Sequence, residues 1–234
     1  MSRNQLKLLA LFTMTIDHIG AFWLTDSSFL WMRVVGRLAF PIFMFLFVEG
    51  AHHSKAKRWV WALKIMGFAV VTQLLFNWVH AGFVNILFLF ALGLLGFEAY
   101  DRGQGWLFIP IAFLAEIFKI DYGMYGIAAM AFFYIFEGKR LQQFLSFAFL
   151  TTFYVFLPYF ENFFPTMLKL FANPGFYWRY FIQLFAIATL LPIALYNPIK
   201  NKRIENPQLY LVWKYFFYIY YPVHIVILNL IGQK

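Results

Sequence analysis

Long apolar runs separated by short polar segments recur along the whole 234-residue chain. A run of about 20 apolar residues is the length that an α-helix needs to cross the hydrocarbon core of a bilayer. The pattern therefore predicts one all-α integral membrane domain, residues 1–234, built as a polytopic bundle of nine spans. The expected spans are 5–24, 29–50, 59–79, 84–100, 105–119, 122–137, 141–160, 177–196 and 209–231.

Two of these spans, 105–119 and 122–137, are short for a full crossing. They could instead form a re-entrant pair of half-helices that enters and leaves from the cytoplasmic side, which would leave seven spans. Prolines bound the segment 157–176, and this pattern indicates a short interfacial helix on the outer face.

Composition supports a membrane protein. The chain is 63% hydrophobic and only 12% charged, with a mean hydropathy of +0.69, whereas soluble domains are about half apolar and a quarter charged. It contains no cysteine, which excludes disulfides and thiolate metal sites. The net charge is +9, and the basic residues responsible for it lie mainly between the spans. Basic residues in such loops set the topology of a membrane protein, so this charge does not indicate binding of nucleic acid.

The basic residues are distributed unequally between the two sides of the bundle. Lysine and arginine concentrate in cytoplasmic segments, so we expect a cytoplasmic amino terminus and an outer carboxyl terminus. The expected cytoplasmic side holds Arg3, Lys55, Lys57, Arg58, Arg102, Lys139, Arg140, Lys200, Lys202 and Arg203, against Lys119, Lys169, Arg179 and Lys234 on the other side.

Asp17 and His18 lie in the first span. An ionised group at bilayer depth costs about 2.5 to 3.5 kcal/mol, so partners are expected. Arg33 and Arg37 lie one turn apart in the second span and repel each other unless an anion joins them. At 1.5 Å per residue, Asp17 lies about 18 Å from the cytoplasmic edge and Arg37 about 12 Å from the outer edge, which is one level in a core of roughly 30 Å.

The last span adds His224, about 22 Å from the cytoplasmic edge by the same estimate. Pro41 leaves the carbonyl of Arg37 without its helical hydrogen bond, which predicts a kink at the arginine. The sequence therefore predicts that three helices bring an acid, two imidazoles and a guanidinium to one layer.

These groups permit three interpretations. An aspartate that orients a histidine makes a general base, and an arginine can stabilise an oxyanion, which suits acyl transfer. The same pair could titrate in a proton-coupled carrier. A third alternative is an interhelical ion pair in a membrane scaffold, without catalysis.

Several motifs lie in order along the chain: DHIG, GRLAFPIF, NILF, YGMYGIA and YYPVHIVIL. In these the chain resembles the TraX family of membrane acetyltransferases. That family is known for amino-terminal acetylation of conjugative pilin, and it is related to transmembrane acyltransferases that use cytoplasmic acyl-CoA. The resemblance implies a multi-pass protein of the bacterial cell membrane. It implies catalytic roles for Asp17, His18, Arg37 and His224, and acceptor or cavity roles for Asn85, Tyr122 and Gly123.

On this interpretation acetyl-CoA is the acyl donor, and no metal is expected. A pantetheine arm of about 16 to 18 Å, comparable to about five extended residues, matches the expected depth of His18. The acceptor, a protein amino terminus, a glycan or a lipid, stays open. The expected donor-binding residues are Arg33, Lys55, Lys57, Arg58, Arg102, Lys139 and Arg140.

Overall fold

A computed structural model describes residues 1–23, 29–54, 57–79, 82–162, 165, 167–168, 172, 178–200 and 206–232. About 85% of the described residues are helical, and these ranges contain no β-strand. The predicted all-α class is therefore confirmed.

Every expected span contains helix, with ends within about four residues of those predicted. The first six spans correspond to α1 (Arg3–Phe22), the pair α2 (Leu30–Gly36) and α3 (Ala39–His53), α4 (Arg58–Trp78), α5 (Leu87–Asp101), η2 (Gly105–Leu107) with α6 (Phe108–Ile117), and α7 (Gly123–Ile135). The last three correspond to α8 (Arg140–Phe156) with η3 (Leu157–Asn162), η4 (Trp178–Thr189) with α11 (Leu190–Ala194), and α12 (Pro207–Gly232); the short η5 (Pro198–Lys200) precedes α12.

Among the described residues, four helices are long and apolar enough to cross a membrane: Leu30–His53, Arg58–Trp78, Arg140–Phe160 and Leu211–Gly232. The apolar helices Gly105–Ile117 and Gly123–Ile135 are shorter; at 1.5 Å per residue each reaches about 20 Å, below a core of roughly 30 Å. The number of nine spans, the re-entrant alternative and the orientation of the amino terminus therefore stay predictions.

The second span is broken where the proline predicts a kink. α2 ends at Gly36, Arg37 and Leu38 form a turn, and α3 begins at Ala39. Pro41 has no N–H to donate to the carbonyl of Arg37, so the helical ladder is interrupted there. The break lets the side chain of Arg37 project at the junction of two helices.

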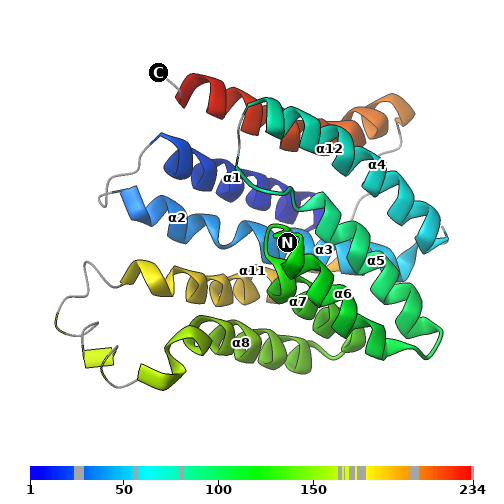
Figure 1. The fold of residues 1–234 in the computed structure, drawn as a ribbon. Helices are drawn as coiled ribbons and strands as arrows, with labels where there is room; N and C mark the ends of the chain where they lie inside the picture. The colour runs from blue at the N-terminus through cyan, green and yellow to red at the C-terminus, as the bar shows by residue number, and fades with distance from the viewer. Residues whose placement is uncertain are drawn as a thin grey trace.

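The helices lie side by side, with α1 between α12 and α2 (Figure 1). η4 packs against both α2 and α8, while α12 also contacts α4, and α7 packs on α3 and α5. Opposite faces of α1 therefore meet different neighbours. Of the expected interfacial segment 157–176, η3 is helical, and most of the remainder lies outside the described residues.

Candidate active site

Asp17 holds two arginines from the broken second span. Its Oδ1 lies 2.9 Å from Nη1 of Arg33, and its Oδ2 lies 3.2 Å from Nη2 of Arg37. A Cβ atom at position 36 would lie 2.2 Å from the Asp17 side chain, so only glycine lets α1 and α2 approach this closely. Two guanidiniums share this carboxylate, and a second carboxylate, Asp121, lies near enough to interact with both of them electrostatically.

Further hydrogen bonds fix the two arginines. Arg33 also donates through Nη1 to the Asp17 carbonyl (3.0 Å), and Arg37 donates through Nε to the Arg33 carbonyl (3.3 Å). Nη1 of Arg37 donates to Oε1 of Gln183 in η4 (3.2 Å). The sequence analysis missed Gln183, although a lone amide within an apolar run was a signal that could have found it.

The two histidines form a second pair. Nδ1 of His18 lies 2.9 Å from Nε2 of His224, and Nδ1 of His224 lies 2.8 Å from the Tyr220 carbonyl. A carbonyl only accepts, so Nδ1 of His224 carries its hydrogen, and in the neutral ring Nε2 then accepts from Nδ1 of His18. This assignment follows from the bonding pattern. It leaves a lone pair on Nε2 of His18.

The predicted convergence in one layer agrees with these contacts, but the predicted orientation of His18 by Asp17 does not. Consecutive residues on an α-helix point about 100° apart. Asp17 therefore faces the arginines of the second span, while His18 faces α12. His224, and not Asp17, is the group that orients the His18 ring.

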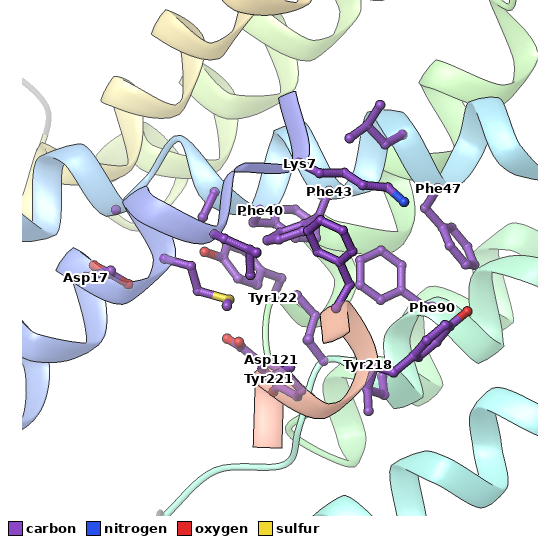
Figure 2. A pocket seen from close by; sticks show the side chains of 18 of the residues that line it. Lys7, Asp17, Phe40, Phe43, Phe47, Phe90, Asp121, Tyr122, Tyr218 and Tyr221 are labelled. Atoms are coloured by element: carbon purple, nitrogen blue, oxygen red, sulfur yellow. The ribbon is translucent and has the colours of Figure 1, made fainter. Parts of the chain in front are cut away.

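A cavity of about 1710 Å³ adjoins both pairs. Asp17, His18, Arg33 and Arg37 line it, and the turn between α6 and α7 contributes two further lining residues. Aromatic side chains of α3, α4, α5 and α12 form much of its wall, and Figure 2 shows Phe40 and Phe43 among them. The other polar lining residues are Ser2, Arg3, Asn4, Lys7, Asp121 and Lys200.

One face of α1 runs along this cavity. Lys7, Leu11, Met14 and His18 all line it, and their spacing of three or four residues places them on one side of a helix. Lys7 and His18 are eleven residues apart, which is about 17 Å along the helix axis. The cavity thus joins a basic end to the histidine pair.

The expected donor-binding residues are mostly elsewhere. Arg33 lines the cavity, whereas Lys57, Arg58, Arg102, Lys139 and Arg140 do not, and Lys55 lies outside the described residues. Arg58 pairs with Asp101, Arg102 pairs with Glu98 at 2.6 Å, and Arg140 lies 4.8 Å from the centre of the Phe45 ring. Loop charge alone does not show which loops face an interior cavity.

Of the three acceptor candidates, only Tyr122 lines the cavity; its ring stacks on Phe40 with centroids 3.9 Å apart. Asn85 is fully buried, and its Nδ2 donates to the Ala69 carbonyl (3.0 Å) and to Oε1 of Gln73 (2.8 Å). Asn85 therefore secures the connection between α4 and α5.

Gly123 also has a structural role. Its φ is +39°, and a Cβ atom there would lie 2.4 Å from Oε2 of Glu116. Glycine thus permits the turn that leads from α6 into α7.

Comparison with known proteins identifies the family to which this bundle belongs. The family model described as TraX protein matches residues 2–232. The chain belongs to the TraX family. No solved structure matches it.

This TraX-family chain is similar to two known proteins. It is 35% identical over 89 residues to the probable fimbrial assembly protein FimC, serogroup H1, of Dichelobacter nodosus, covering 35% of this chain and 36% of that protein. It is 28% identical over 137 residues to protein TraX of Escherichia coli strain K12, covering 55% and 54% of the two chains. The chain thus spans about a third and about half of the length of these relatives.

Proposed function

We propose that this TraX-family protein is a transmembrane acyltransferase that moves an acetyl group from cytoplasmic acetyl-CoA to an amine or hydroxyl acceptor in or across the membrane. The observation that carries the proposal is the lone pair on Nε2 of His18. His18 lies beside the Arg33 and Arg37 pair, in a cavity that also has a basic end.

The dimensions of the cavity support such a donor. Acetyl-CoA carries phosphates at one end of a pantetheine arm of about 16 to 18 Å and the thioester at the other end. The axial distance from Lys7 to His18, about 17 Å, matches that arm. Arg3 and Lys200 line the cavity together with Lys7, although Arg3 also pairs with Glu49 at 3.1 Å. The phosphates would bind these cations, and the arm would follow the α1 face.

The histidine pair supplies the proton transfers. Nε2 of His18 takes the proton of the acceptor N–H or O–H as the acceptor attacks the thioester carbon. The new C–N or C–O bond converts the carbonyl oxygen to an oxyanion, which N–H groups of Arg33 and Arg37 stabilise. The C–S bond then breaks, and the proton on His18 passes to the departing thiolate.

His224 keeps the His18 ring in place through this cycle. While Nε2 of His18 holds the proton, Nδ1–H of His18 still donates to His224, whose own N–H donates to the Tyr220 carbonyl. This chain of hydrogen bonds stabilises the imidazolium. The similarity to a probable fimbrial assembly protein favours a fimbrial protein as the acceptor.

Purified protein in nanodiscs, radiolabelled acetyl-CoA and a cell-envelope fraction provide the test. His18→Ala is expected to lower transfer by on the order of 10² to 10⁴-fold, the range for loss of a general base. His53→Ala, an exposed histidine on α3, serves as the control. A correctly inserted His18→Ala protein with full transfer would overturn the proposal. Flux driven by a pH gradient in liposomes, without acetyl transfer, would support the carrier instead.

A further inference from the structure

Three groups, each from a different element, hold the Arg37 guanidinium. Nη2 donates to the Asp17 carboxylate in α1, Nε donates to the Arg33 carbonyl in α2, and Nη1 donates to Oε1 of Gln183 in η4. The three nitrogens form the corners of one planar group, so Nη1 lies off the line that joins Nε and Nη2. Without Gln183 the guanidinium could rotate about that line, and the contact with Gln183 removes this freedom.

Nη1 of Arg37 has a second N–H that can reach a ligand. Each Nη atom of arginine carries two N–H groups, and Gln183 accepts one of those on Nη1. Within the described residues no other hydrogen bond involves Nη1. Arg37 lines the cavity, so this second N–H is available to a substrate oxygen, and Gln183 sets its direction.

The geometry of η4 brings Gln183 to Arg37. η4 is a 3₁₀-helix of 12 residues, whereas such helices rarely exceed about four residues. Its three residues per turn put Gln183, Ala186 and Thr189 in one line, and the last two are fully buried. Figure 1 shows this stretch, which leads into α11, between α2 and α8. In an α-helix, six residues at about 100° each would turn Gln183 about 120° away from Thr189.

The amide of Gln183 has a defined orientation. A guanidinium only donates, so the amide oxygen faces Arg37 and Nε2 points away from it. The Tyr125 hydroxyl interacts with this amide and lies 3.0 Å from Oγ1 of Thr151 in α8. Within the described residues, however, the buried Nε2 has no hydrogen bond of ordinary geometry. A buried donor left in this way costs stability, so the contribution of the amide is its bond to Arg37.

We propose that Gln183 is a positioning residue for the acyl transfer, which fixes Arg37 so that one N–H of Nη1 meets the oxyanion. The inference rests on the proposed acyl transfer. Gln183 does not line the cavity, so it acts through Arg37 and does not touch the substrate. A donor fixed in direction before the reaction stabilises the developing charge without reorganisation. Gln183 should therefore affect kcat, and not the binding of acetyl-CoA.

Kinetics of purified protein in nanodiscs test this inference. Gln183→Leu is expected to lower kcat about tenfold, the value of one hydrogen bond to a charged group, with the KM for acetyl-CoA unchanged. Gln183→Glu keeps an acceptor oxygen at the same reach and should recover most of kcat. Gln143→Leu is the matched control, because Gln143 is a buried glutamine of α8 outside the cavity, and its Nε2 donates to the Phe133 carbonyl at 2.8 Å.

A double-mutant cycle shows whether Gln183 acts through Arg37. In an Arg37→Gln background, Gln183→Leu should lower kcat no further, because no guanidinium is left to position. A loss of kcat that persists undiminished in that background would overturn the inference. Failure of Gln183→Glu to recover any kcat would also overturn it, since the loss would then come from packing.

NMR of protein labelled with ¹⁵N-arginine, without donor, separates this inference from the proposed enzyme activity. The Arg37 side-chain resonances are those that Arg37→Gln removes. Gln183→Leu should shift or broaden them, Gln183→Glu should not broaden them, and Gln143→Leu should leave them unchanged. This result would support the hold of Gln183 on Arg37 even if the native protein transferred no acetyl group. Unchanged Arg37 resonances in Gln183→Leu would overturn the inference and leave the acyltransferase standing.

Discussion

Two polar clusters in this bundle differ in how completely their polar groups are paired. One lies where the ends of α3, α4, α5 and α7 meet. There Arg58 pairs with Asp101, and the Tyr134 hydroxyl donates to Asp101 at 2.8 Å. The two ring nitrogens of His52 lie 3.2 Å from the Tyr134 carbonyl and 2.6 Å from Glu137. Arg58 and Asp101 thus neutralise each other, and Glu137 and Tyr134 are joined through the His52 ring.

The cavity cluster is paired less completely. Asp17 serves two arginines, Nε2 of His18 carries a lone pair, and Asp121 has no ion pair within the described residues. The cluster at the helix ends therefore holds the bundle together. The cavity cluster, in contrast, keeps hydrogen-bonding groups that a substrate can contact. Substitutions of the same kind should therefore have different effects in the two clusters.

Removal of the central carboxylate charge should have the largest effect. Asp17→Asn leaves two partly buried guanidiniums without their anion, which is expected to lower the free energy of unfolding by about 3 to 5 kcal/mol. Asp101→Asn acts on a carboxylate whose side chain is 45% exposed, so solvent limits the loss to about 1 kcal/mol or less. Unfolding in a detergent titration measures both. Equal losses would contradict the contrast between the clusters.

Loss of one arginine should affect catalysis rather than stability. Arg37→Gln is expected to lower kcat for acetyl transfer about 10² to 10³-fold, as for removal of one donor to an oxyanion. Arg58→Gln, in the cluster at the helix ends, should leave kcat unchanged. Radiolabelled acetyl transfer at saturating donor measures kcat. An unchanged kcat in Arg37→Gln would exclude Arg37 from stabilising the transition state.

The sequence predicts the helices and the convergence of the polar layer because both follow from simple distances. Apolar runs set the helix ends, Pro41 sets the break, and a rise of 1.5 Å per residue puts Asp17 and Arg37 at the same depth. Side-chain direction needs one further step. Asp17 and His18 are neighbours in sequence, and their 100° separation on the helix sends them to different partners.

The expected donor-binding residues show what loop charge does not predict. Charge in a loop indicates which side of the membrane it occupies, but it does not show which helix ends surround a cavity. That Lys7 and His18 lie on one face of α1 could have been predicted from their separation of eleven residues. The position of Asp121 beside the cavity could not be predicted, because it depends on the hydrogen bond from its N–H to the Val84 carbonyl, far away in sequence.

The close contact of α1 with α2 depends on Gly36. A Cβ atom in Gly36→Ala would collide with Asp17 at 2.2 Å, and overpacking of this kind is expected to cost about 1 to 3 kcal/mol and to lower transfer with it. Gly67→Ala in α4 is the matched control, because its Cβ would meet nothing within 4 Å and alanine favours the helix by up to about 1 kcal/mol. Thermal unfolding of both variants is the measurement. A stable, active Gly36→Ala protein would show that Asp17 can bind the arginines in another geometry.

The smallest expected effect concerns the basic end of the cavity. Lys7→Gln removes one charge from the proposed phosphate site and should raise the KM for acetyl-CoA about tenfold. The KM for acetyl-pantetheine, which lacks the nucleotide, should not change. Lys64→Gln, an exposed lysine of α4 that does not line the cavity, controls for loss of positive charge. If Lys57→Gln raised the KM for acetyl-CoA and Lys7→Gln did not, the donor would bind the cytoplasmic loops, and the α1 face would not be its path to His18.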